Sequence, residues 1–185
     1  MKPRNCPRAI PHIAYVLVGD GSMRKPLEQR ARERALGNVH FIALQPAEVF
    51  HNLLAASDLA VVTQQRSVAD IVFPSKVLTL LASARPVVAS LNESSEVARV
   101  LREAGAGVVV EPETPSALFE SVTALRADAG RRAAMSARGR LYARQQWDRD
   151  QILARMEGQL QALWQRSSRG GGVTREADPI LSTAK

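Results

Sequence analysis

The sequence has one cysteine, Cys6, and aromatic residues make up 4% of its 185 residues. A single cysteine cannot form an intrachain disulfide, which excludes the framework of a small disulfide-stabilised secreted protein. No apolar run approaches the roughly 18 to 20 residues that a membrane-spanning helix needs, and residues 1–12 lack the apolar segment of a signal peptide. We therefore expect a cytoplasmic protein.

The net charge of +7 comes from the periphery of the chain. Residues 1–12 carry three basic side chains and no acid, and residues 126–155 carry eight arginines against three acids. Nucleic acid is not expected as a partner, because few aromatic side chains accompany the arginines to stack on bases. The basic C-terminal helices are expected to be either solvated or turned toward an anionic membrane surface, which is compatible with a peripheral position at the inner membrane face.

Several catalytic classes lack their motifs. His12, His40 and His51 fall in different predicted elements without the spacing of metal ligands, so no metal site is expected. The chain has neither a G-x-S-x-G nucleophile elbow nor a Walker lysine sequence. These absences disfavour α/β hydrolases and P-loop enzymes.

Short apolar segments alternate with amphipathic ones from residue 13 onward, which predicts a doubly wound α/β domain with a parallel sheet, Rossmann-like topology and a helical C-terminus. We expect a basic segment at 1–12, one domain at 13–165 and a disordered, glycine- and serine-rich tail at 166–185. The predicted strands cover 13–21, 38–44, 58–63, 85–90 and 107–112. The predicted helices cover 24–36, 46–57, 75–84, 94–105, 115–125, 130–145 and 148–165, with the hydroxyl of Thr114 capping the helix from Pro115.

Ligands bind such sheets at the carboxyl ends of the strands, where "VLVGDGSM" places Gly19 and Gly21. Backbone N–H groups and the dipole of the following helix favour a phosphate there, although the glycines are also explained by a tight turn. Arg24 stands where a dinucleotide fingerprint has its third glycine, and no acid ends the second predicted strand. NAD is therefore disfavoured.

The second candidate stretch is "FPSK", in which Ser75 is a suitable N-cap and Lys76 falls in the first turn of a helix. A cation there interacts unfavourably with the helix dipole, at a cost of a few tenths of a kcal/mol. An anion bound by Lys76 and the free N–H groups of the turn would reverse that cost. The alternative is a solvated lysine whose stem lies over Phe73.

Four stretches resemble, in this order, the C-terminal nucleotide-sugar domain of family-four glycosyltransferases with the GT-B fold. They are "YVLVGDGSMRKPLE", "NVHFIALQPAEVFHNLLAASDLAVV", "ADIVFPSKVLTLLASARPVVAS" and "SSEVARVLREAGAGVVVEPETPSAL". The resemblance spans about residues 13 to 160 and is greatest to the colanic acid and exopolysaccharide biosynthesis branch. It implies one half of a GT-B enzyme whose N-terminal half is absent from this sequence.

The resemblance also implies a donor-binding site. By this likeness the diphosphate approaches the loop after the first strand, the phosphates or sugar meet the helix start at "SK", and the nucleobase lies near Leu44 and Gln45. The Ser95–Glu96 pair is a capping device or a donor contact. The implied donor-binding residues are Gly19, Asp20, Gly21, Ser22, Leu44, Asp70, Ser75, Lys76, Thr79, Ser95 and Glu96.

The chain departs from the family pattern at several positions. Thr79 and Ile71 stand where many members have two glutamates, and Asp70 is a candidate substitute for the first of them. Ala84 replaces the glycine usual before the Arg-Pro pair, which adds a methyl group near a tight approach.

The function expected from the resemblance is transfer of a sugar from a nucleotide diphosphate sugar to a glycan or lipid-linked acceptor in polysaccharide biosynthesis, with no cofactor or metal. We expect the catalytic step to need an N-terminal acceptor-domain polypeptide as partner, and we expect no activity without it. The alternative is a truncated, non-catalytic α/β remnant or interaction module.

Overall fold

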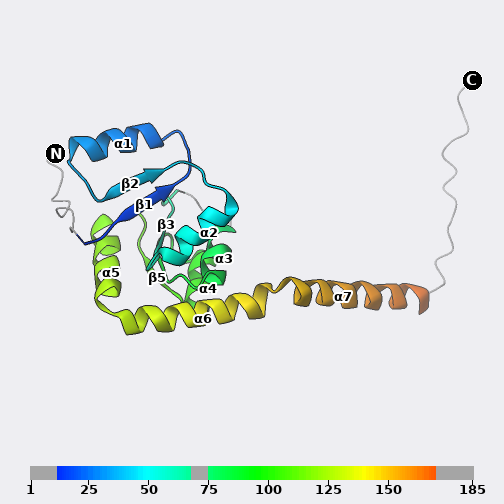
Figure 1. Cartoon of the computed structure of the whole chain (residues 1–185). Coiled ribbons are helices and arrows are strands. Elements are labelled where there is room, and N and C mark those ends of the chain that lie inside the picture. Colours follow the sequence, from blue (N-terminus) through cyan, green and yellow to red (C-terminus); the bar gives the residue numbers. More distant parts are fainter. Residues whose placement is uncertain (1–11, 68–74, 170–185) are drawn as a thin grey trace, which may run out of the picture. The chain divides into compact units, whose positions relative to one another are not determined.

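The computed structural model describes residues 12–67 and 75–169 (Figure 1). The chain divides into two units, residues 1–145 and residues 146–185, whereas the sequence predicts one domain to residue 165. The first unit contains every strand of the described residues, and the second contains helix α7, Arg149–Arg169. This helix continues past residue 165, into the segment that the sequence predicts to be a disordered tail.

The described strands are all parallel, as predicted, but they form two sheets. Strands β1 (Tyr15–Val18) and β2 (Val39–Ile42) form a two-stranded sheet in which Tyr15 lies opposite Val39. Strands β3 (Ala60–Thr63), β4 (Val87–Ser90) and β5 (Gly107–Val110) form a three-stranded sheet in the order β3-β4-β5. Among the described residues, the hydrogen-bonded strands of this parallel α/β fold thus fall into two groups.

Six helices of the described residues begin in the first unit and follow the strands in the predicted alternation (Figure 1). Each one lies within a few residues of its predicted range, because apolar periodicity and turn residues place a helix well but its ends less well. The helices are α1 (Arg24–Glu33), α2 (Ala47–Ala56), α3 (Ser75–Ala82), α4 (Glu96–Glu103), α5 (Pro115–Ala127) and α6 (Ala129–Trp147).

The core of the first unit lies around β4, whose four residues are all buried. Val88 packs in a cluster with Val122 and Leu125 of α5 and Met135 of α6. Helix α4 buries Val97, Val100 and Leu101, as its apolar spacing predicts, and it contacts β5. In contrast, α1 buries no residue, so the β1–β2 sheet is the less consolidated part of the fold.

Helix α3 ends in a turn whose backbone conformation at Ala84 is one that glycine adopts more easily than alanine. The N–H of Arg85 donates to the carbonyl of Leu80 and the N–H of Ala84 to that of Leu81, which is the Schellman pattern. Ala84 has a φ of 55°, in the left-handed region where a Cβ is disfavoured. This backbone conformation explains why glycine is usual at this position and why alanine is costly there.

Replacing Ala84 with glycine should therefore stabilise the fold. We expect Ala84→Gly to raise the free energy of unfolding by about 0.5 to 1 kcal/mol, since relief of left-handed strain exceeds the extra chain entropy of glycine. Urea unfolding followed by circular dichroism measures the change. Ala82→Gly, at the last residue of α3 and without a positive φ, is the control and should destabilise by up to about 1 kcal/mol. A neutral or destabilising Ala84→Gly would contradict the strain.

Candidate functional site

The loop after β1 is open to a ligand. Gly19 has a φ of 128°, so its backbone conformation requires glycine. A Cβ added at Gly19 or Gly21 would meet nothing within 4 Å. The tight-turn explanation therefore accounts for Gly19, whereas Gly21 has neither a positive φ nor a packing neighbour that demands glycine. Gly21 and Ser22 are exposed immediately before α1.

Arg24 holds this loop from the first residue of α1. Its Nη1 lies 2.7 Å from Asp20 Oδ1 and donates to the carbonyl of Gly19 at 3.1 Å, while its Nε donates to Glu28 Oε1 at 2.8 Å. The hydrogen bonds that the Arg24 guanidinium donates to Glu28 and Asp20 raise its pKa. Asp20 is thus engaged in an ion pair that orders the loop. Arg24 was not among the predicted site residues, although the four-residue spacing of Asp20, Arg24 and Glu28 indicates such ion pairs on a helix.

The second group of predicted residues lies on α3. Ser75 is the first residue of this helix, one position later than the N-cap that the sequence suggests. The side chain of Lys76 is exposed, and the first turn of α3 contains no acidic residue. Thr79 is half-buried three residues after Lys76, so the two lie on the same side of the helix. Asp70, the candidate substitute for a family glutamate, lies outside the described residues.

The Ser95–Glu96 pair begins α4. The N–H of Ala98 donates to the buried hydroxyl of Ser95 at 3.1 Å, which confirms the predicted cap. Glu96 forms an ion pair with Arg99, whose hydrogen bond lowers the pKa of this carboxyl. Both side chains thus have partners within the helix, and a donor contact through either stays a prediction.

Two further predictions concern helix and strand ends. Leu44 is exposed just after β2, and the Nε2 of the neighbouring Gln45 donates to the carbonyl of Ala43 at 2.9 Å.

The predicted hydroxyl cap of α5 is wrong, because Thr114 Oγ1 donates backward to the carbonyl of Pro112 at 3.4 Å and accepts no N–H of the helix. Pro115 is at the first position of α5 as expected.

A hollow of about 300 Å³ lies at the carboxyl ends of β3 and β4. Thr63, Gln64 and Ser90 line it from the strands, and Thr114 and Leu118 line it from the start of α5. Sequence reasoning missed these residues, although the strand-end rule pointed to the positions that close 58–63 and 85–90. Nearby, Arg66 bridges the loops after β3 and β5 through an ion pair of 3.2 Å with Glu111.

The predicted site residues are thus divided between the two sheets. Gly19, Asp20, Gly21, Ser22 and Leu44 follow strands of the β1–β2 sheet, whereas Lys76 and the Ser95–Glu96 pair follow strands of the β3–β4–β5 sheet. All follow the carboxyl end of a strand. Among residues 12–67 and 75–169, no three His, Cys, Asp or Glu side chains gather as a metal site, and none of the helices is sufficiently long and apolar to span a bilayer.

Parallel strands that alternate with helices define an α/β class of protein, in which ligands bind at the carboxyl ends of the strands. The sequence profile of the family "Glycosyl transferases group 1" matches residues 3–142, which is most of the chain, so the chain belongs to this family. The predicted membership and the α/β half of a GT-B fold are confirmed.

Similar proteins of known class are also glycosyltransferases. One is the colanic acid biosynthesis glycosyl transferase WcaI of Escherichia coli (strain K12). It is 32% identical over 111 residues, which are 60% of this chain and 27% of that protein. The Anabaena protein Alr3699/HepE, solved in complex with UDP, has a TM-score of 0.71 and 21% identity, over 83% of this chain and 42% of that one.

A third relative is the C-terminal domain of the group 1 glycosyl transferase LpcC from Francisella tularensis. It has a TM-score of 0.55 and 18% identity, over 68% of this chain and 62% of that domain. The chain therefore spans about a quarter of the length of the curated relative WcaI and a larger share of an isolated C-terminal domain.

Proposed function

We propose that this chain is the donor-binding half of a glycosyltransferase that moves a sugar from a nucleoside diphosphate to a glycan or lipid-linked acceptor in polysaccharide biosynthesis. The observation that carries the proposal is the exposed Lys76 in the first turn of α3, where no acid accompanies it. A cation opposed to a helix dipole is stabilised when an anion binds between it and the N–H groups of the turn.

The glycine loop supports the same ligand. The open backbone at Gly21 and Ser22 precedes α1, and the ion pair between Arg24 and Asp20 orders this loop. Helix N-termini and fixed cations stabilise the negative charge that develops on a departing diphosphate, so the proposed reaction needs no metal or other cofactor from this half. The complex of HepE with UDP and the likeness to WcaI favour a nucleotide-sugar donor and a polysaccharide context.

Calorimetric titration of the purified protein with UDP, GDP and UDP-glucose tests the proposal. We expect binding of at least one of them with a dissociation constant of about 1 mM or tighter, since the site has few enclosing walls in this half alone. Circular dichroism of the same sample is the control that establishes whether the titrated protein is folded. Folded protein that binds none of the three would favour the alternative, a non-catalytic α/β module.

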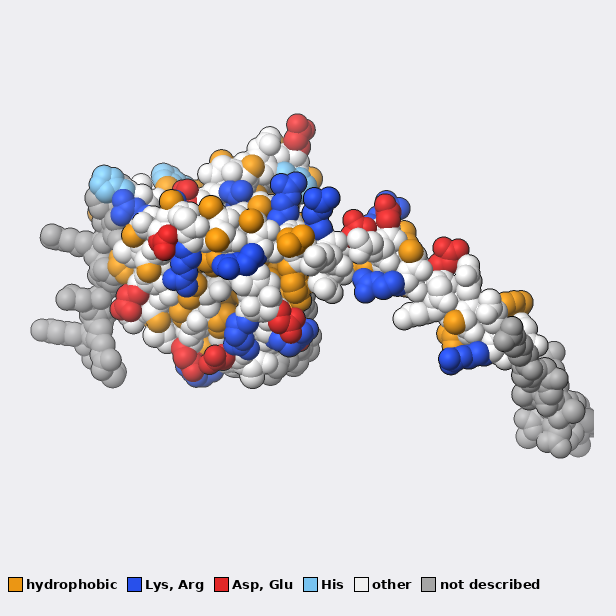
Figure 2. Space-filling view, turned by 90° about the horizontal axis from the view of Figure 1, so that it is seen from below, with side chains coloured by type: hydrophobic (Ala, Val, Ile, Leu, Met, Phe, Trp, Pro, Cys, Tyr) orange, Lys and Arg blue, Asp and Glu red, His pale blue; other side chains and the backbone are white. Residues whose placement is uncertain are grey.

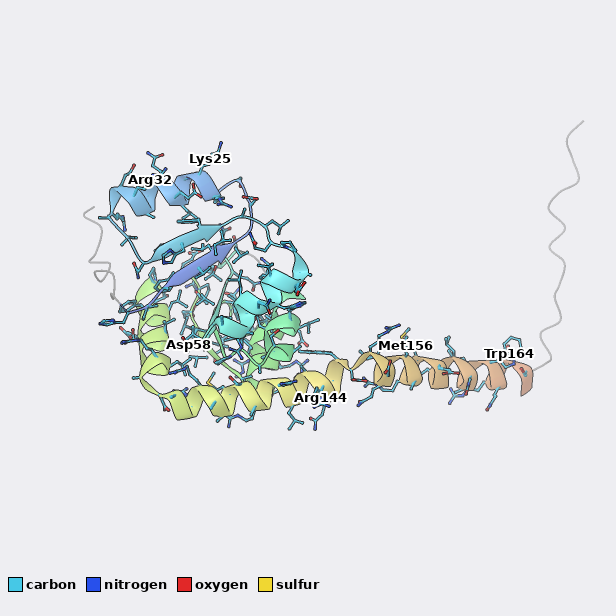
Figure 3. The ribbon with its side chains drawn as sticks, viewed as in Figure 1. Lys25, Arg32, Asp58, Arg144, Met156 and Trp164 are labelled. Atoms are coloured by element: carbon cyan, nitrogen blue, oxygen red, sulfur yellow. The ribbon has the colours of Figure 1, made fainter. Side chains whose placement is uncertain are left out.

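We also propose that the second unit attaches the protein to an anionic membrane surface. Helix α7 exposes Met156, Leu160, Leu163 and Trp164, the last at 75% of its surface (Figure 3). Met156, Leu160 and Leu163 recur every three to four positions, and Trp164 follows directly. Arg155 and Arg166 flank this apolar group, which is typical of helices that lie in a membrane interface. Vesicles of phosphatidylglycerol should co-sediment the protein more than vesicles of phosphatidylcholine, and equal sedimentation would contradict the proposal.

The first unit gives less reason to expect membrane or nucleic-acid contact. Figure 2 shows acidic side chains among the basic ones over its visible face. Arg99 and Arg102, for example, pair with glutamates of α4 or of the residues just before it. Their positive charge is thus locally balanced.

A further inference from the structure

The hollow of about 300 Å³ lies on the face of the β3–β4–β5 sheet that α5 covers. Thr63 and Ser90, at the ends of β3 and β4, are partners in the register, so their side chains are on the same face. Val88, two residues before Ser90, is on that face too, and it packs in a cluster with Val122 of α5. The hollow is therefore enclosed between the strand ends and the start of α5.

Lys76 belongs to the opposite face of this sheet. Gly107 is the register partner of Val87, and a Cβ added at Gly107 would lie 2.9 Å from Cδ2 of Leu101 on α4. Helix α4 thus covers the face of Val87. The crossovers through α3 and α4 run in the same direction along the order β3-β4-β5. Because such crossovers are right-handed, α3 lies on the same face as α4. The hollow and the candidate phosphate site at Lys76 therefore lie on different faces.

The lining of the hollow carries little charge. Among the described residues that line it, Glu113 is the only charged one, and no lysine or arginine is present. A phosphate would meet the carboxylate of Glu113 without a cation in the lining to offset the repulsion. The volume is at the lower end of the roughly 300 to 1,000 Å³ of small-molecule sites. The hollow is thus suited to a small neutral ligand, and a nucleotide is disfavoured there.

Amide and hydroxyl groups of the lining are available to such a ligand. The side-chain amides of Gln64 and Gln65 have no hydrogen-bond partner among the described residues, and Gln64 is half-buried. The hydroxyls of Ser90 and Thr114 each donate to a backbone carbonyl, at 3.3 and 3.4 Å, so their oxygens can still accept. Leu118 adds a half-buried apolar wall. Donors, acceptors and an apolar wall together match a sugar ring, which has hydroxyl groups around its edge and C–H groups on its faces.

Hydrogen bonds fix the walls of the hollow. The backbone N–H of Arg66 donates to Glu113 Oε1 at 3.2 Å, and the Nη2 of Arg66 donates to the carbonyl of Pro112 at 3.2 Å. The Nδ2 of Asn92 donates to the carbonyl of Arg66 at 3.3 Å, so the loops after β3, β4 and β5 are joined. Glu113 has a φ of 61°, a strained conformation that persists only where the surroundings hold it. A site whose walls are already held loses less entropy when a ligand binds.

We propose that the hollow binds one sugar ring of the glycan acceptor, a ring other than the one that reacts. The sugar of the donor is attached to the diphosphate, which the proposed function assigns to Lys76 on the other face. The reacting ring of the acceptor must lie beside the donor sugar, so the ring in the hollow is a further unit of the same glycan. The assignment to the acceptor rests on the proposed function, whereas the binding of a sugar ring rests on the lining of the hollow alone.

Titration of methyl glycosides into the whole protein tests the sugar site without any nucleotide. The probes are the methyl glycosides of glucose, galactose, mannose and N-acetylglucosamine, and the isotope-labelled protein is followed by NMR. We expect at least one probe to shift the side-chain amide signals of Gln64 and Gln65 saturably, with a dissociation constant of about 1 to 50 mM. A well-dispersed spectrum in which no probe moves these signals would overturn the sugar site.

Matched variants show whether the lining makes the contacts. Gln64→Leu removes the amide at similar size and should weaken binding of the probe roughly ten-fold or more, since the lost hydrogen bonds are not replaced. Gln145→Leu makes the same change on the exposed surface of α6 and should leave the affinity unchanged. Thr63→Val keeps a β-branched side chain in β3 and removes only the hydroxyl, so a roughly three-fold loss is expected without damage to the strand. Unchanged affinity in both Gln64→Leu and Thr63→Val would contradict the site.

Titrations with nucleotides identify the molecule that carries the ring. In the presence of saturating UDP-glucose, the probe should bind with the same affinity within about two-fold, because the two ligands occupy separate places. If UDP-glucose excluded the probe and shifted the amide signals of Gln64 and Gln65 while UDP did not, the sugar of the donor would occupy the hollow, and the assignment to the acceptor would be wrong.

The same titrations keep the sugar site and the donor site apart. Binding of a probe by protein that binds neither UDP nor UDP-glucose would support the sugar site and count against both the donor site and the assignment to the acceptor. Binding of UDP by protein whose amide signals of Gln64 and Gln65 move with no probe would overturn the sugar site and leave the donor site standing.

Discussion

Gly139→Leu is expected to lower the free energy of unfolding of the first unit by about 3 kcal/mol, because the new side chain has no space. A Cβ at this position of α6 would lie 2.9 Å from the Cβ of Ala106 and 3.1 Å from Cδ2 of Leu81. Ala106 and Leu81 are fully buried, so neither can turn toward solvent. Glycine at this position permits α6 to lie close to Ala106, just before β5, and to the side chain of Leu81 on α3. Urea unfolding at the tryptophan and far-ultraviolet signals measures the loss.

Gly130→Leu is the matched control on the same helix. A Cβ at Gly130 would meet only Asp128 Oδ1, at 3.6 Å, which is an ordinary contact. This variant should change the free energy of unfolding by no more than about 1 kcal/mol, with the gain in helix propensity as the main contribution. Equal destabilisation by the two leucines would mean that α6 does not pack closely at Gly139.

The helices and strands were predictable because each carries its own local signal. Val97, Val100 and Leu101 recur on one face of α4, and Gly105, with a φ of 56°, ends the helix where the sequence suggests. The β-branched runs that became β1 to β5 needed no tertiary information. Boundaries differ by a few residues, since helix ends depend on individual hydrogen bonds such as those that Ala84 and Arg85 donate to the last turn of α3.

The division of the sheet was less predictable from the elements alone. Local patterns establish that Tyr15–Val18 and Ala60–Thr63 are strands, but they do not state which strands are neighbours. Among the described residues, β1 pairs with β2 alone and β3 with β4 alone, so both are edge strands of their sheets.

The strand ends that carry the candidate residues were predictable, and the partners of the side chains there were less so. The strand-end rule located the Gly19–Ser22 loop and Lys76, because parallel strands all present their carboxyl ends on one side. It could not reveal that Asp20 is paired with Arg24 or that Glu96 is paired with Arg99, since a side chain's partner depends on rotamers as well as spacing. Acidic residues that seemed available for a ligand thus serve the local structure.

Lys76→Ala should weaken binding of UDP or GDP about ten- to a hundred-fold, equivalent to the roughly 1.5 to 3 kcal/mol of a hydrogen bond to a charged group. The lysine is exposed in the first turn of α3, and that turn contains no acidic residue that its removal would leave unpaired. The fold should be unchanged or slightly more stable, because a cation near the N-terminus of a helix opposes its dipole. Calorimetric titration beside a thermal melt measures both effects.

Two matched variants separate charge at the site from charge in general. Lys76→Arg keeps the cation and should retain most of the affinity, within about ten-fold, because guanidinium also binds phosphate. Arg126→Ala removes a positive charge from the last turn of α5, a helix that begins after β5 and so ends away from the carboxyl ends of the strands. It should leave the affinity unchanged. If Arg126→Ala weakened binding as much as Lys76→Ala did, the net charge of the protein would account for the nucleotide affinity, and the anion would have no specific place at the start of α3.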